Sequence, residues 1–493
     1  MSRPGIVACR GLEQDEAFPP DDPKLAPRPG SDRRGFYEAR AHFRPREAQR
    51  KYHRLLERYY KSLIPPGARV LEVGCGLGDL LAALQPSTGV GLDFSMEMVR
   101  LARDRHPNHT FFVGDAENFQ IGAQFDFIIL SDLVNDLQDV QNTLARLRRF
   151  AHPRTRLVLN FFNYLWLPIL KAAESLQLKA PTPRQNWLST SDMINLLNLA
   201  GWEVLKSDAR ILWPVRTPFL EPLCNRWLAP FLRHLCLTMF CVARLKPSVF
   251  LGNRDLPCSV VIPARNEAGN IESAVRRTPE MGLGTEIIFV EGGSSDATLE
   301  EIQRVTAAYP RRKVRTLRQQ GFGKSNAVRE AFGVATGDIL FILDADLTVA
   351  PEELPKFYEA IRSGTGEFIN GVRLVYPPED QAMRFLNMIA NKLFSLAFGW
   401  LLGQPIKDTL CGTKVLLRAD YNQIEQSASE FGRIDPFGDF DLLFGAARLN
   451  LRIVDLPVRY RARQYGKSNI RRWKHGVRLV KVFAAGATRL KFI

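Results

Sequence analysis

Two acidic residues at the end of an apolar segment are the first candidates for chemistry in this chain. Asp344 and Asp346 stand one residue apart, where the apolar run 339–343 ends. Two carboxylates this close at the end of a buried strand repel each other, and the arrangement is costly unless a cation lies beside them. A divalent metal that carries a diphosphate meets this need, because carboxylate and phosphate oxygens can share one Mg²⁺ or Mn²⁺ ion. We therefore expect Asp344 and Asp346 to bind a metal and a diphosphate.

A glycine-rich turn after the apolar segment 70–73 forms a second candidate site. Glu72 stands near the end of the segment, and glycines then occupy every second position. Glycine lets the backbone pass close to a bound ligand at such a turn. Asp79 replaces the glycine that a dinucleotide-binding turn needs, which disfavours an NAD-dependent dehydrogenase and favours a nucleoside without phosphates. The glycines are Gly74, Gly76 and Gly78.

Polar residues also follow the next apolar segments in this half of the chain. Asp93 ends the segment 89–93, where a carboxylate can accept hydrogen bonds from a pair of ribose hydroxyls. Asp115, with Ala116 beside it, follows the third segment and is suited to an adenine amino group. These features predict a sheet whose strand ends surround one nucleoside. The polar residues after the fourth segment are Ser131, Asp132 and Asn135.

This order of segments resembles the class I S-adenosylmethionine-dependent methyltransferases over residues 40–250. The resemblance implies a Rossmann-like α/β domain with S-adenosylmethionine as its cofactor. It implies that Asp93 holds the ribose, and that Asp115 and Ala116 border the adenine. The methyl group is expected to emerge after the fourth strand, although no general base can be named. The residues expected around the methionine part of the cofactor are Glu72, Gly74, Gly76 and Gly78.

The second half of the chain begins with three strand-like segments that each end in polar residues, the last of them in the acidic pair. Their order resembles family 2 glycosyltransferases of the GT-A type, and among these the dolichol-phosphate mannose synthase-like enzymes, over residues 256–475. The resemblance implies a second α/β domain with a GT-A fold, a nucleotide-diphospho-sugar donor, and Mg²⁺ or Mn²⁺ at Asp344 and Asp346. The residues expected to border the nucleotide are Pro263, Arg265 and Glu267, and those expected to face the phosphates are Arg373 and Arg463.

Asp439 and Asp441 are the remaining catalytic candidates of this domain. A hydroxyl acceptor needs a general base, whereas a phosphate acceptor is already anionic and needs none. The resemblance places Asp441 at the base position. The alternative is that both are carboxylates at a helix N-terminus, where the helix dipole stabilises them.

Two departures from the family pattern concern the substrates. Glu291 stands where the family usually has the first aspartate of Asp-Asp-Gly-Ser, so either Glu291 replaces the residue near the nucleotide base or base selection differs. Asn469 ends the basic motif where polyprenyl-phosphate enzymes commonly have lysine, and Lys467 lies two positions earlier. The identities of the donor and of a phosphate acceptor therefore stay open.

Composition agrees with two globular domains, since the 493 residues are 45% hydrophobic and 24% charged. The connection at 246–256 is short, so we expect the domains to touch. The expected parts are a disordered tail at 1–38, a methyltransferase-like domain at 39–250, a GT-A domain at 256–475, and a basic amphipathic helix at 476–493.

The net charge of +15 is concentrated near the C-terminus, where eleven Lys and Arg and no acidic residue follow from Arg459 onward. We expect the terminal helix to lie on an anionic membrane surface, or to cover its own domain, or both. No nucleic-acid motif is present, and the uncharged apolar runs are shorter than the roughly 20 residues that span a bilayer. Seven cysteines without C-x-x-C spacing, and the lack of a leader, favour a cytoplasmic protein on the inner face of a membrane.

The leading functional hypothesis is a bifunctional enzyme that glycosylates and methylates intermediates of an envelope glycan or lipid. Its glycosyl acceptor is expected to be lipid-linked, for example a polyprenyl phosphate, or a glycan. The alternative is a membrane-docked glycosyltransferase whose N-terminal domain binds S-adenosylmethionine only as a regulatory or structural module.

Overall fold

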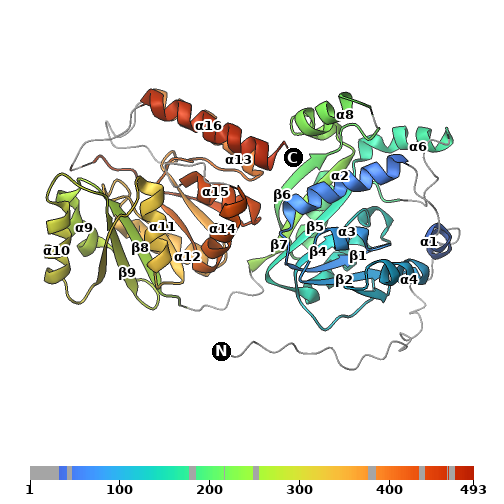
Figure 1. The fold of residues 1–493 in the computed structure, drawn as a ribbon, viewed down its shortest axis with the longest axis horizontal. Coiled ribbons are helices and arrows are strands. Elements are labelled where there is room, and N and C mark those ends of the chain that lie inside the picture. Colours follow the sequence, from blue (N-terminus) through green and yellow to red (C-terminus); the bar gives the residue numbers. More distant parts are fainter. Residues whose placement is uncertain are drawn as a thin grey trace.

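Two seven-stranded sheets, each flanked by helices, lie side by side in the computed structural model (Figure 1). This arrangement confirms an α/β fold repeated in two successive domains. The described residues are 33–41, 47–176, 185–215, 217–247, 255–375, 385–431, 439–463, 465 and 472–492.

The N-terminal sheet has the strand order β3-β2-β1-β4-β5-β7-β6, with β7 antiparallel to both of its neighbours. Its strands are β1 (Arg69–Val73), β2 (Thr88–Asp93), β3 (Thr110–Val113), β4 (Phe125–Leu130), β5 (Ala151–Phe162), β6 (Trp202–Arg210) and β7 (Thr238–Leu245). The helices are α1 (Arg33–Ala41), α2 (Glu47–Leu63), α3 (Asp79–Ala83), α4 (Met96–Arg105), α5 (Val140–Leu147), α6 (Leu167–Ser175), α7 (Thr190–Leu199) and α8 (Leu220–Pro222). Short 3-10 turns are η2 (Val134–Asp136), η3 (Arg148–Phe150), η4 (Tyr164–Trp166) and η6 (Arg233–Leu235), and η5 (Leu223–Leu228) is a π-helical turn.

The C-terminal sheet has the order β10-β9-β8-β11-β13-β12-β14, with β13 antiparallel between β11 and β12. Its strands are β8 (Cys258–Ala264), β9 (Thr285–Glu291), β10 (Lys313–Arg318), β11 (Ile339–Ile342), β12 (Phe368–Val372), β13 (Lys414–Leu417) and β14 (Ile453–Pro457). The helices are α9 (Ala268–Arg277), α10 (Thr298–Ala308), α11 (Lys324–Val334), α12 (Leu354–Arg362), α13 (Phe385–Leu402), α14 (Arg418–Phe431), α15 (Asp439–Arg448) and α16 (Arg472–Leu490), with the short turn η8 (Pro351–Glu353).

The central strands are mostly apolar and buried because helices cover both faces of each sheet. In β1, Leu71 packs into one buried cluster, whereas Val70 packs into the cluster on the opposite face. In β11, Leu340 and Phe341 divide in the same way between two clusters. Side chains that alternate between two buried faces are what a largely parallel sheet requires. The carboxyl ends of these strands therefore meet at one edge of each sheet, where the polar residues of interest follow.

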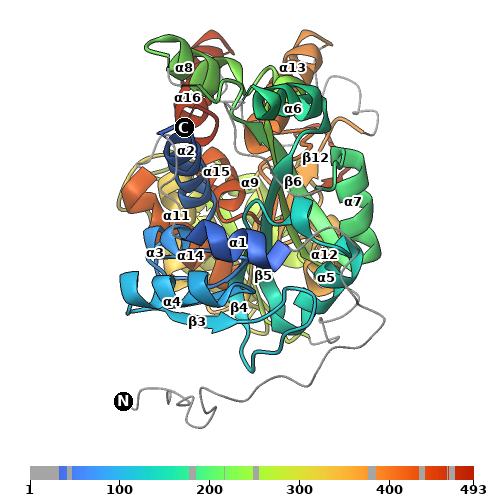
Figure 2. The same ribbon diagram turned by 90° about the vertical axis from the view of Figure 1, so that its right-hand side faces the viewer.

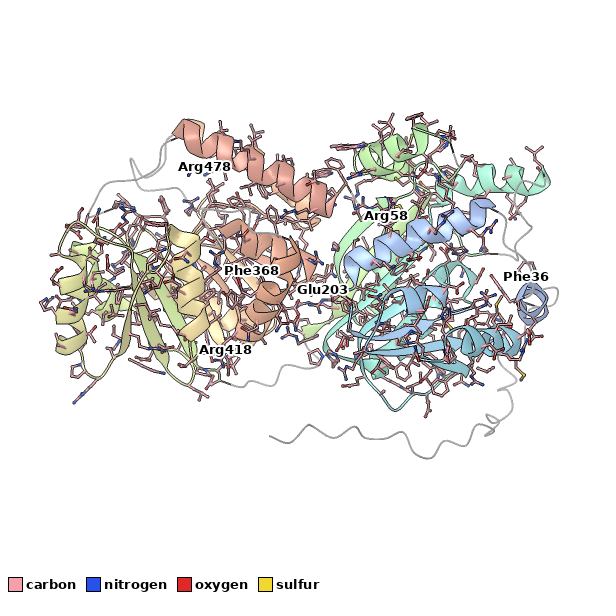
Figure 3. All side chains as sticks on the ribbon, viewed as in Figure 1. Phe36, Arg58, Glu203, Phe368, Arg418 and Arg478 are labelled. Atoms are coloured by element: carbon pink, nitrogen blue, oxygen red, sulfur yellow. The ribbon has the colours of Figure 1, made fainter. Side chains whose placement is uncertain are left out.

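The two domains touch through ion pairs and hydrogen bonds of arginine side chains, as the short connection predicts. One guanidinium nitrogen of Arg156, in β5, donates hydrogen bonds to both carboxylate oxygens of Glu367, at 2.8 Å each. Arg244 of β7 binds the carbonyl of Gly364 at 2.9 Å. Glu203 of β6 pairs with Arg452 at 3.0 Å, and Figure 3 shows Glu203 at the boundary between the domains. Fixed charged contacts therefore hold the modules against each other.

Both ends of the chain differ in detail from the expected boundaries. α1 begins at Arg33, so the last residues of the expected tail at 1–38 are helical, whereas residues 1–32 lie outside the described part. α16 begins at Arg472, before the expected boundary at 476. Among the described residues, no helix is both long and apolar enough to cross a membrane.

Candidate active sites

The glycine-rich turn of the N-terminal domain has the backbone conformation that only glycine adopts readily. Gly74, Gly76 and Gly78 have φ values of 75°, 50° and 74°. A Cβ at Gly78 would lie 2.6 Å from the ring of Phe111, so a larger residue there would force β3 and the turn apart. The turn joins β1 to α3 at the carboxyl edge of the sheet. The sequence pattern thus identified a turn whose geometry depends on its glycines.

Glu72 lies in β1, just before this turn, and one of its acceptor atoms is unused. Only 2% of its surface is exposed, and its Oε2 atom has no hydrogen-bond partner among the described residues. Burial raises the pKa of Glu72 to about 8, an effect that a hydrogen bond from the backbone of Leu81 only partly offsets. A buried carboxylate oxygen without a partner is costly unless a ligand supplies a donor. A cationic group such as the ammonium of a methionine moiety fits this position.

Asp93 is held at the end of β2 by the backbone around it. Its two carboxylate oxygens accept hydrogen bonds from Gly76 N at 2.8 Å and Ser95 N at 2.9 Å. These bonds aim the carboxylate toward the glycine-rich turn, and each oxygen retains a second lone pair for a hydroxyl. Asp115 is exposed beyond β3, with Ala116 beside it, and accepts from Glu117 N at 2.8 Å. Glu72 and Asp93 lie near the carboxyl ends of β1 and β2, and Asp115 follows β3; the three strands are neighbours in the sheet.

A buried polar network beside this turn was not identified from sequence. Asp132 has an unusual φ of 53° and accepts a hydrogen bond from Tyr52 Oη at 2.8 Å and one from Asn160 at 2.5 Å. Tyr60 donates to Asn160 at 2.7 Å. Burial raises the pKa of Asp132 and, well above its usual value, that of Tyr52. Asp132 was noted only as a polar residue after the fourth strand, because its partners come from α2 and β5, far away in sequence.

The Asp132 network lies next to the cofactor turn. Val73 is paired with Leu130 in adjacent strands, so the residues that follow each of them emerge side by side. A Cβ at Gly74 would lie 2.9 Å from the side chain of Leu133, which confirms this proximity. Asn135, the third polar residue of the segment, instead binds the backbone of Asn186 and Phe162 and so fixes local structure.

In the C-terminal domain, protein side chains supply the cations that the acidic pair needs. Lys324 Nζ lies 2.6 Å from Asp344 and 3.8 Å from Asp439. Arg463 binds Asp346 at 2.7 Å. Burial alone would raise the pKa of Asp344, but Lys324 outweighs it and holds the pKa below its usual value. The repulsion between the two carboxylates is therefore offset by the positive charges of Lys324 and Arg463.

Lys324 was not among the candidate residues, although the sequence carries a signal for it. Lys324 begins α11, and a cation in the first turn of a helix is opposed by the helix dipole. An unfavourable charge at this position needs a partner elsewhere, and the partners here are two carboxylates. Asp439 likewise begins α15, so the expected helix start at 439–441 is present. At the start of α15, Asp439 comes within 3.8 Å of Lys324 Nζ, a contact that the sequence spacing does not show.

Of the residues expected on the nucleotide side, Glu267 binds Arg463. Besides Asp346, Arg463 binds Glu267 at 3.0 Å. Glu291 ends β9, and its carboxylate accepts a hydrogen bond from Ser294 N at 2.5 Å. This bond orders the loop in which the sequence differs from the family pattern. Pro263 is half-buried at the end of β8, and Arg265 is exposed beyond it. Glu267, Asp346 and Arg463 thus form one cluster, whereas Arg265 takes no part in it.

Arg373 is paired with a buried carboxylate. Its guanidinium donates to Asp408 at 2.7 and 2.9 Å, and 0% of the Asp408 side chain is exposed. Asp408 outweighs the effect of burial and raises the pKa of Arg373. This bidentate pair ties β12 to the segment before β13. Among the described residues, the contacts of Arg373 are therefore structural, although contact with a donor phosphate remains a prediction.

The donor set fits a metal that is shared with a diphosphate. No group of three metal-ligating side chains occurs among the described residues. Mg²⁺ in such sites commonly uses only one or two carboxylates and takes its other ligands from phosphates and water. Gly412 passes directly against the Asp344 carboxylate, where any side chain would collide. A metal at Asp344 and Asp346 stays a prediction, and it requires Lys324 and Arg463 to turn toward the phosphates.

Comparison with known families agrees with this division of the chain. A family model described as Methyltransferase domain matches residues 40–207, and one described as Glycosyl transferase family 2 matches residues 259–423. The dolichol-phosphate mannosyltransferase of Pyrococcus furiosus is 38% identical over 109 residues, which is 22% of this chain and 30% of that protein. The undecaprenyl-phosphate 4-deoxy-4-formamido-L-arabinose transferase of Edwardsiella ictaluri is 27% identical over 214 residues, 43% of this chain and 62% of that protein. The matched region thus spans less than two thirds of either relative.

Among solved structures, each domain has its own similar proteins. Magnesium protoporphyrin IX methyltransferase from Synechocystis PCC 6803 is 20% identical with a TM-score of 0.32, covering 43% of this chain and 94% of that one. Glucosyl-3-phosphoglycerate synthase from Mycobacterium tuberculosis is 19% identical with a TM-score of 0.35, covering 48% of this chain and 80% of that one.

The chain therefore contains two domains that belong to enzyme families. The first is a domain of the S-adenosylmethionine-dependent methyltransferases with a Rossmann-like fold. The second is a family 2 glycosyltransferase domain of GT-A type. The expected fusion of these two families is thereby confirmed.

Proposed function

We propose that the protein is a bifunctional enzyme that works at a membrane surface. The C-terminal domain transfers a sugar from a nucleotide-diphospho-sugar to a lipid-linked acceptor, and the N-terminal domain transfers a methyl group from S-adenosylmethionine. One observation supports both activities: each sheet gathers ligand-type side chains at its own carboxyl edge, Glu72 and Asp93 in one and Asp344 and Asp346 in the other. The functions of the two relatives favour a polyprenyl phosphate as acceptor.

For glycosyl transfer, we assign distinct tasks to the charged residues. A Mg²⁺ or Mn²⁺ ion bound by Asp344 and Asp346 would neutralise the departing diphosphate. Lys324 and Arg463, which pair with these carboxylates, would then donate to phosphate oxygens. Glu267 keeps Arg463 oriented. A phosphate acceptor attacks without losing a proton, so Asp441 is needed as a base only if the acceptor is a hydroxyl.

For methyl transfer, the Asp132 network is our candidate for orienting the acceptor. A carboxylate that accepts from Tyr52 and Asn160 beside the cofactor turn can receive a proton from a hydroxyl acceptor. The alternative is a domain that binds S-adenosylmethionine only to regulate the glycosyltransferase. Calorimetry with the cofactor and its demethylated product, followed by methyl transfer to membrane extracts, separates the two. Binding without any transfer would favour the regulatory function.

Two features support an anionic membrane as the partner. Exposed apolar side chains occur on α6, α8, α13 and α16. These helices lie along the same upper side of the molecule in both views (Figures 1 and 2). In α16, Leu479 and Val482 are buried against the glycosyltransferase core, whereas Val477 and Val480 are exposed beside Arg478 and Lys481. One face of α16 thus covers its domain while the other combines apolar and basic residues, as interfacial helices do.

The methyltransferase domain extends this surface. In the stretch 213–235 the exposed large apolar residues include Phe219 at 90% and Phe231 at 64%. The ring of Phe231 stacks on that of Trp400 in α13, with 5.1 Å between the ring centroids. The ring centroids of Trp227 and Phe492, which follows α16, lie 4.7 Å apart. These ring contacts join the apolar residues of both domains into one surface. We call this surface, made by 213–235 with the exposed residues of α6, α13 and α16, the apolar face.

The decisive test of the glycosyltransferase assignment is Asp346→Asn. The amide is nearly isosteric and removes a negative charge, so the fold should persist, while metal-dependent binding of nucleotide sugars and nearly all glycosyl transfer should be lost. Calorimetry against a panel of donors, with and without Mn²⁺, measures binding. Asp338→Asn is the matched control, since this carboxylate precedes the same strand at its opposite end and pairs with Arg418. Full activity of Asp346→Asn without metal would refute the mechanism.

A further inference from the structure

A cavity of about 360 Å³ lies between the two domains, apart from both candidate active sites. The methyltransferase domain lines it with residues of α2, β6 and β7, and the glycosyltransferase domain with the ends of α13, α15 and α16. Arg448, at the C-terminus of α15, belongs to the lining, whereas Asp439 at the N-terminus of this helix belongs to the active site. A helix of 10 residues is about 15 Å long, which separates the cavity from the sugar-transfer site.

The cavity wall is strongly cationic. Among its described lining residues, the one carboxylate is Asp208, and five side chains are basic. Asp208 is shared by Arg210 at 2.9 Å and Lys491 at 3.4 Å, and Arg233 lies 3.8 Å away. The basic lining residues are Lys206, Arg210, Arg448, Arg489 and Lys491.

Lys206 has little compensation from the described protein groups around it. Its hydrogen-bond acceptor among the described residues is the carbonyl of Ala447, at a long 3.5 Å. Burial, followed by the nearby Lys491, lowers the pKa of Lys206 to about 7. Burial also lowers the pKa of Lys491, although Asp208 opposes the shift. The protein thus keeps like charges close together in a site that shields them from water, which is costly without an anion.

Apolar side chains form much of the remaining wall, which strengthens the attraction for an anion. Leu401 and Leu490 come from one domain, and Leu63, Phe240 and Val242 from the other. Charges attract more strongly beside such surfaces than in water. The volume also lies in the range of small-molecule sites.

We propose that this interdomain cavity binds a phosphate-bearing anion, with Lys206, Arg210 and Lys491 as its main contacts. Guanidinium and ammonium groups together are suited to phosphate oxygens. A phosphate monoester carries about −1.5 to −2 charges at neutral pH, and this charge offsets the positive charge that Asp208 does not neutralise. Because Lys206 and Arg210 belong to one domain and Lys491 to the other, the anion stabilises the contact between domains. Its source is either a soluble phosphomonoester or the headgroup of a lipid monophosphate.

Chemical labelling of the complete chain tests this proposal. A lysine with a pKa near 7 reacts with acetic anhydride at neutral pH, and mass spectrometry reports the modification of each lysine. We expect inorganic phosphate or phenyl phosphate to reduce labelling of Lys206 about tenfold at a concentration about ten times the dissociation constant. Lys61, exposed on the same helix α2 that lines the cavity, serves as the internal control and should stay equally reactive.

A second arm distinguishes the two sources of the anion. If the ligand is a lipid, vesicles of phosphatidylcholine with phosphatidic acid protect Lys206, whereas free phosphate and pure phosphatidylcholine vesicles do not. If the ligand is soluble, free phosphate suffices. Thermal unfolding gives a readout that does not need a reactive lysine: the ligand that protects Lys206, free phosphate or phosphatidic acid vesicles, should raise the midpoint of the wild type and of Lys61→Gln, but not of Lys206→Gln. Unprotected Lys206 in both arms, with no midpoint shift in the wild type, would overturn the proposal.

Discussion

At the scale of single residues, Glu72 has the most informative environment in the N-terminal domain. It is buried, one of its oxygens lacks a partner among the described residues, and burial raises its pKa to about 8. A carboxyl group whose pKa is higher in the folded state than in the unfolded chain contributes its full stabilisation below the pKa of the unfolded chain. This contribution is lost as the pH rises through about 8. A cationic ligand reverses this cost because it favours the ionised form.

We predict that binding of S-adenosylmethionine releases a proton and becomes tighter as the pH rises toward about 8. Glu72→Gln should remove this pH dependence and weaken binding about ten- to a hundredfold, since a hydrogen bond to a charged group contributes about 1.5–3 kcal/mol. Calorimetry in buffers of different ionisation enthalpy measures both effects. Glu97→Gln, at an exposed pair with Arg100, is the control. Unchanged, pH-dependent binding by Glu72→Gln would exclude Glu72 as the cofactor carboxylate.

A second prediction at this scale concerns Asp93, whose carboxylate faces the glycine-rich turn. Asp93→Ala should abolish cofactor binding but leave nucleotide-sugar binding intact, because the two sites belong to separate sheets. Parallel titrations of one protein sample with both ligands provide the measurement. A joint loss of both affinities in a folded protein would contradict two independent sites.

At the scale of elements, α16 serves two structural roles. Its buried side packs on α13 and α15, and the residues after it reach the methyltransferase domain, where Arg210 binds the carbonyl of Lys491 at 2.7 Å. Arg226 likewise binds the carbonyl of Phe492 at 3.1 Å. Deleting residues 476–493 would therefore damage the domain interface together with any membrane contact. Point substitutions on the apolar face test membrane binding without this complication.

We predict that Phe219→Asn combined with Leu223→Ser weakens binding to anionic liposomes by at least about tenfold. Burying one such side chain contributes about 1.5–3 kcal/mol, and asparagine tolerates the φ of 64° at position 219. Liposome flotation measures the loss, and Leu283→Ser, at a 71% exposed position of the other domain, is the control. Arg478→Gln with Lys481→Gln should reduce the salt-sensitive part of binding. If only the α16 pair affected flotation, the methyltransferase domain would not take part in membrane binding.

At the scale of the whole molecule, buried charges fix how the domains meet. Glu367 binds Arg156 in one domain, lies 3.6 Å from Arg244, and accepts from Arg452 N at 2.8 Å. Burial alone would raise the pKa of Glu367, but Arg156 and Arg244 outweigh it and lower the pKa. A carboxyl group whose pKa is lower in the folded state than in the unfolded chain stabilises the native state at pH values above the pKa of the unfolded chain. This contribution is lost as the pH falls through the pKa of the folded state. The contact between domains should therefore weaken first in acid.

We predict that Glu367→Gln destabilises the native protein by about 3–5 kcal/mol, because it leaves buried arginines without their partner. Glu352→Gln, which breaks a more exposed pair with Arg277, should cost less than about 1 kcal/mol. Denaturant unfolding followed in each domain gives both values, and the difference between the two variants should shrink in acid. Equal, small effects of both substitutions would mean that the interface is not held by this network.

The sequence by itself determined the two domain types, the strand order of the motifs, and most candidate residues, because glycine turns and strand-end carboxylates depend on local spacing. Glu72, Asp93, Asp344 and Asp346 are recognisable for this reason. Only the tertiary structure decided what surrounds them. Lys324 meets Asp344, Tyr52 meets Asp132, and Lys206 meets Lys491 through contacts between segments far apart in the chain. Such pairings depend on how sheets, helices and domains pack, and no local pattern of residues encodes them.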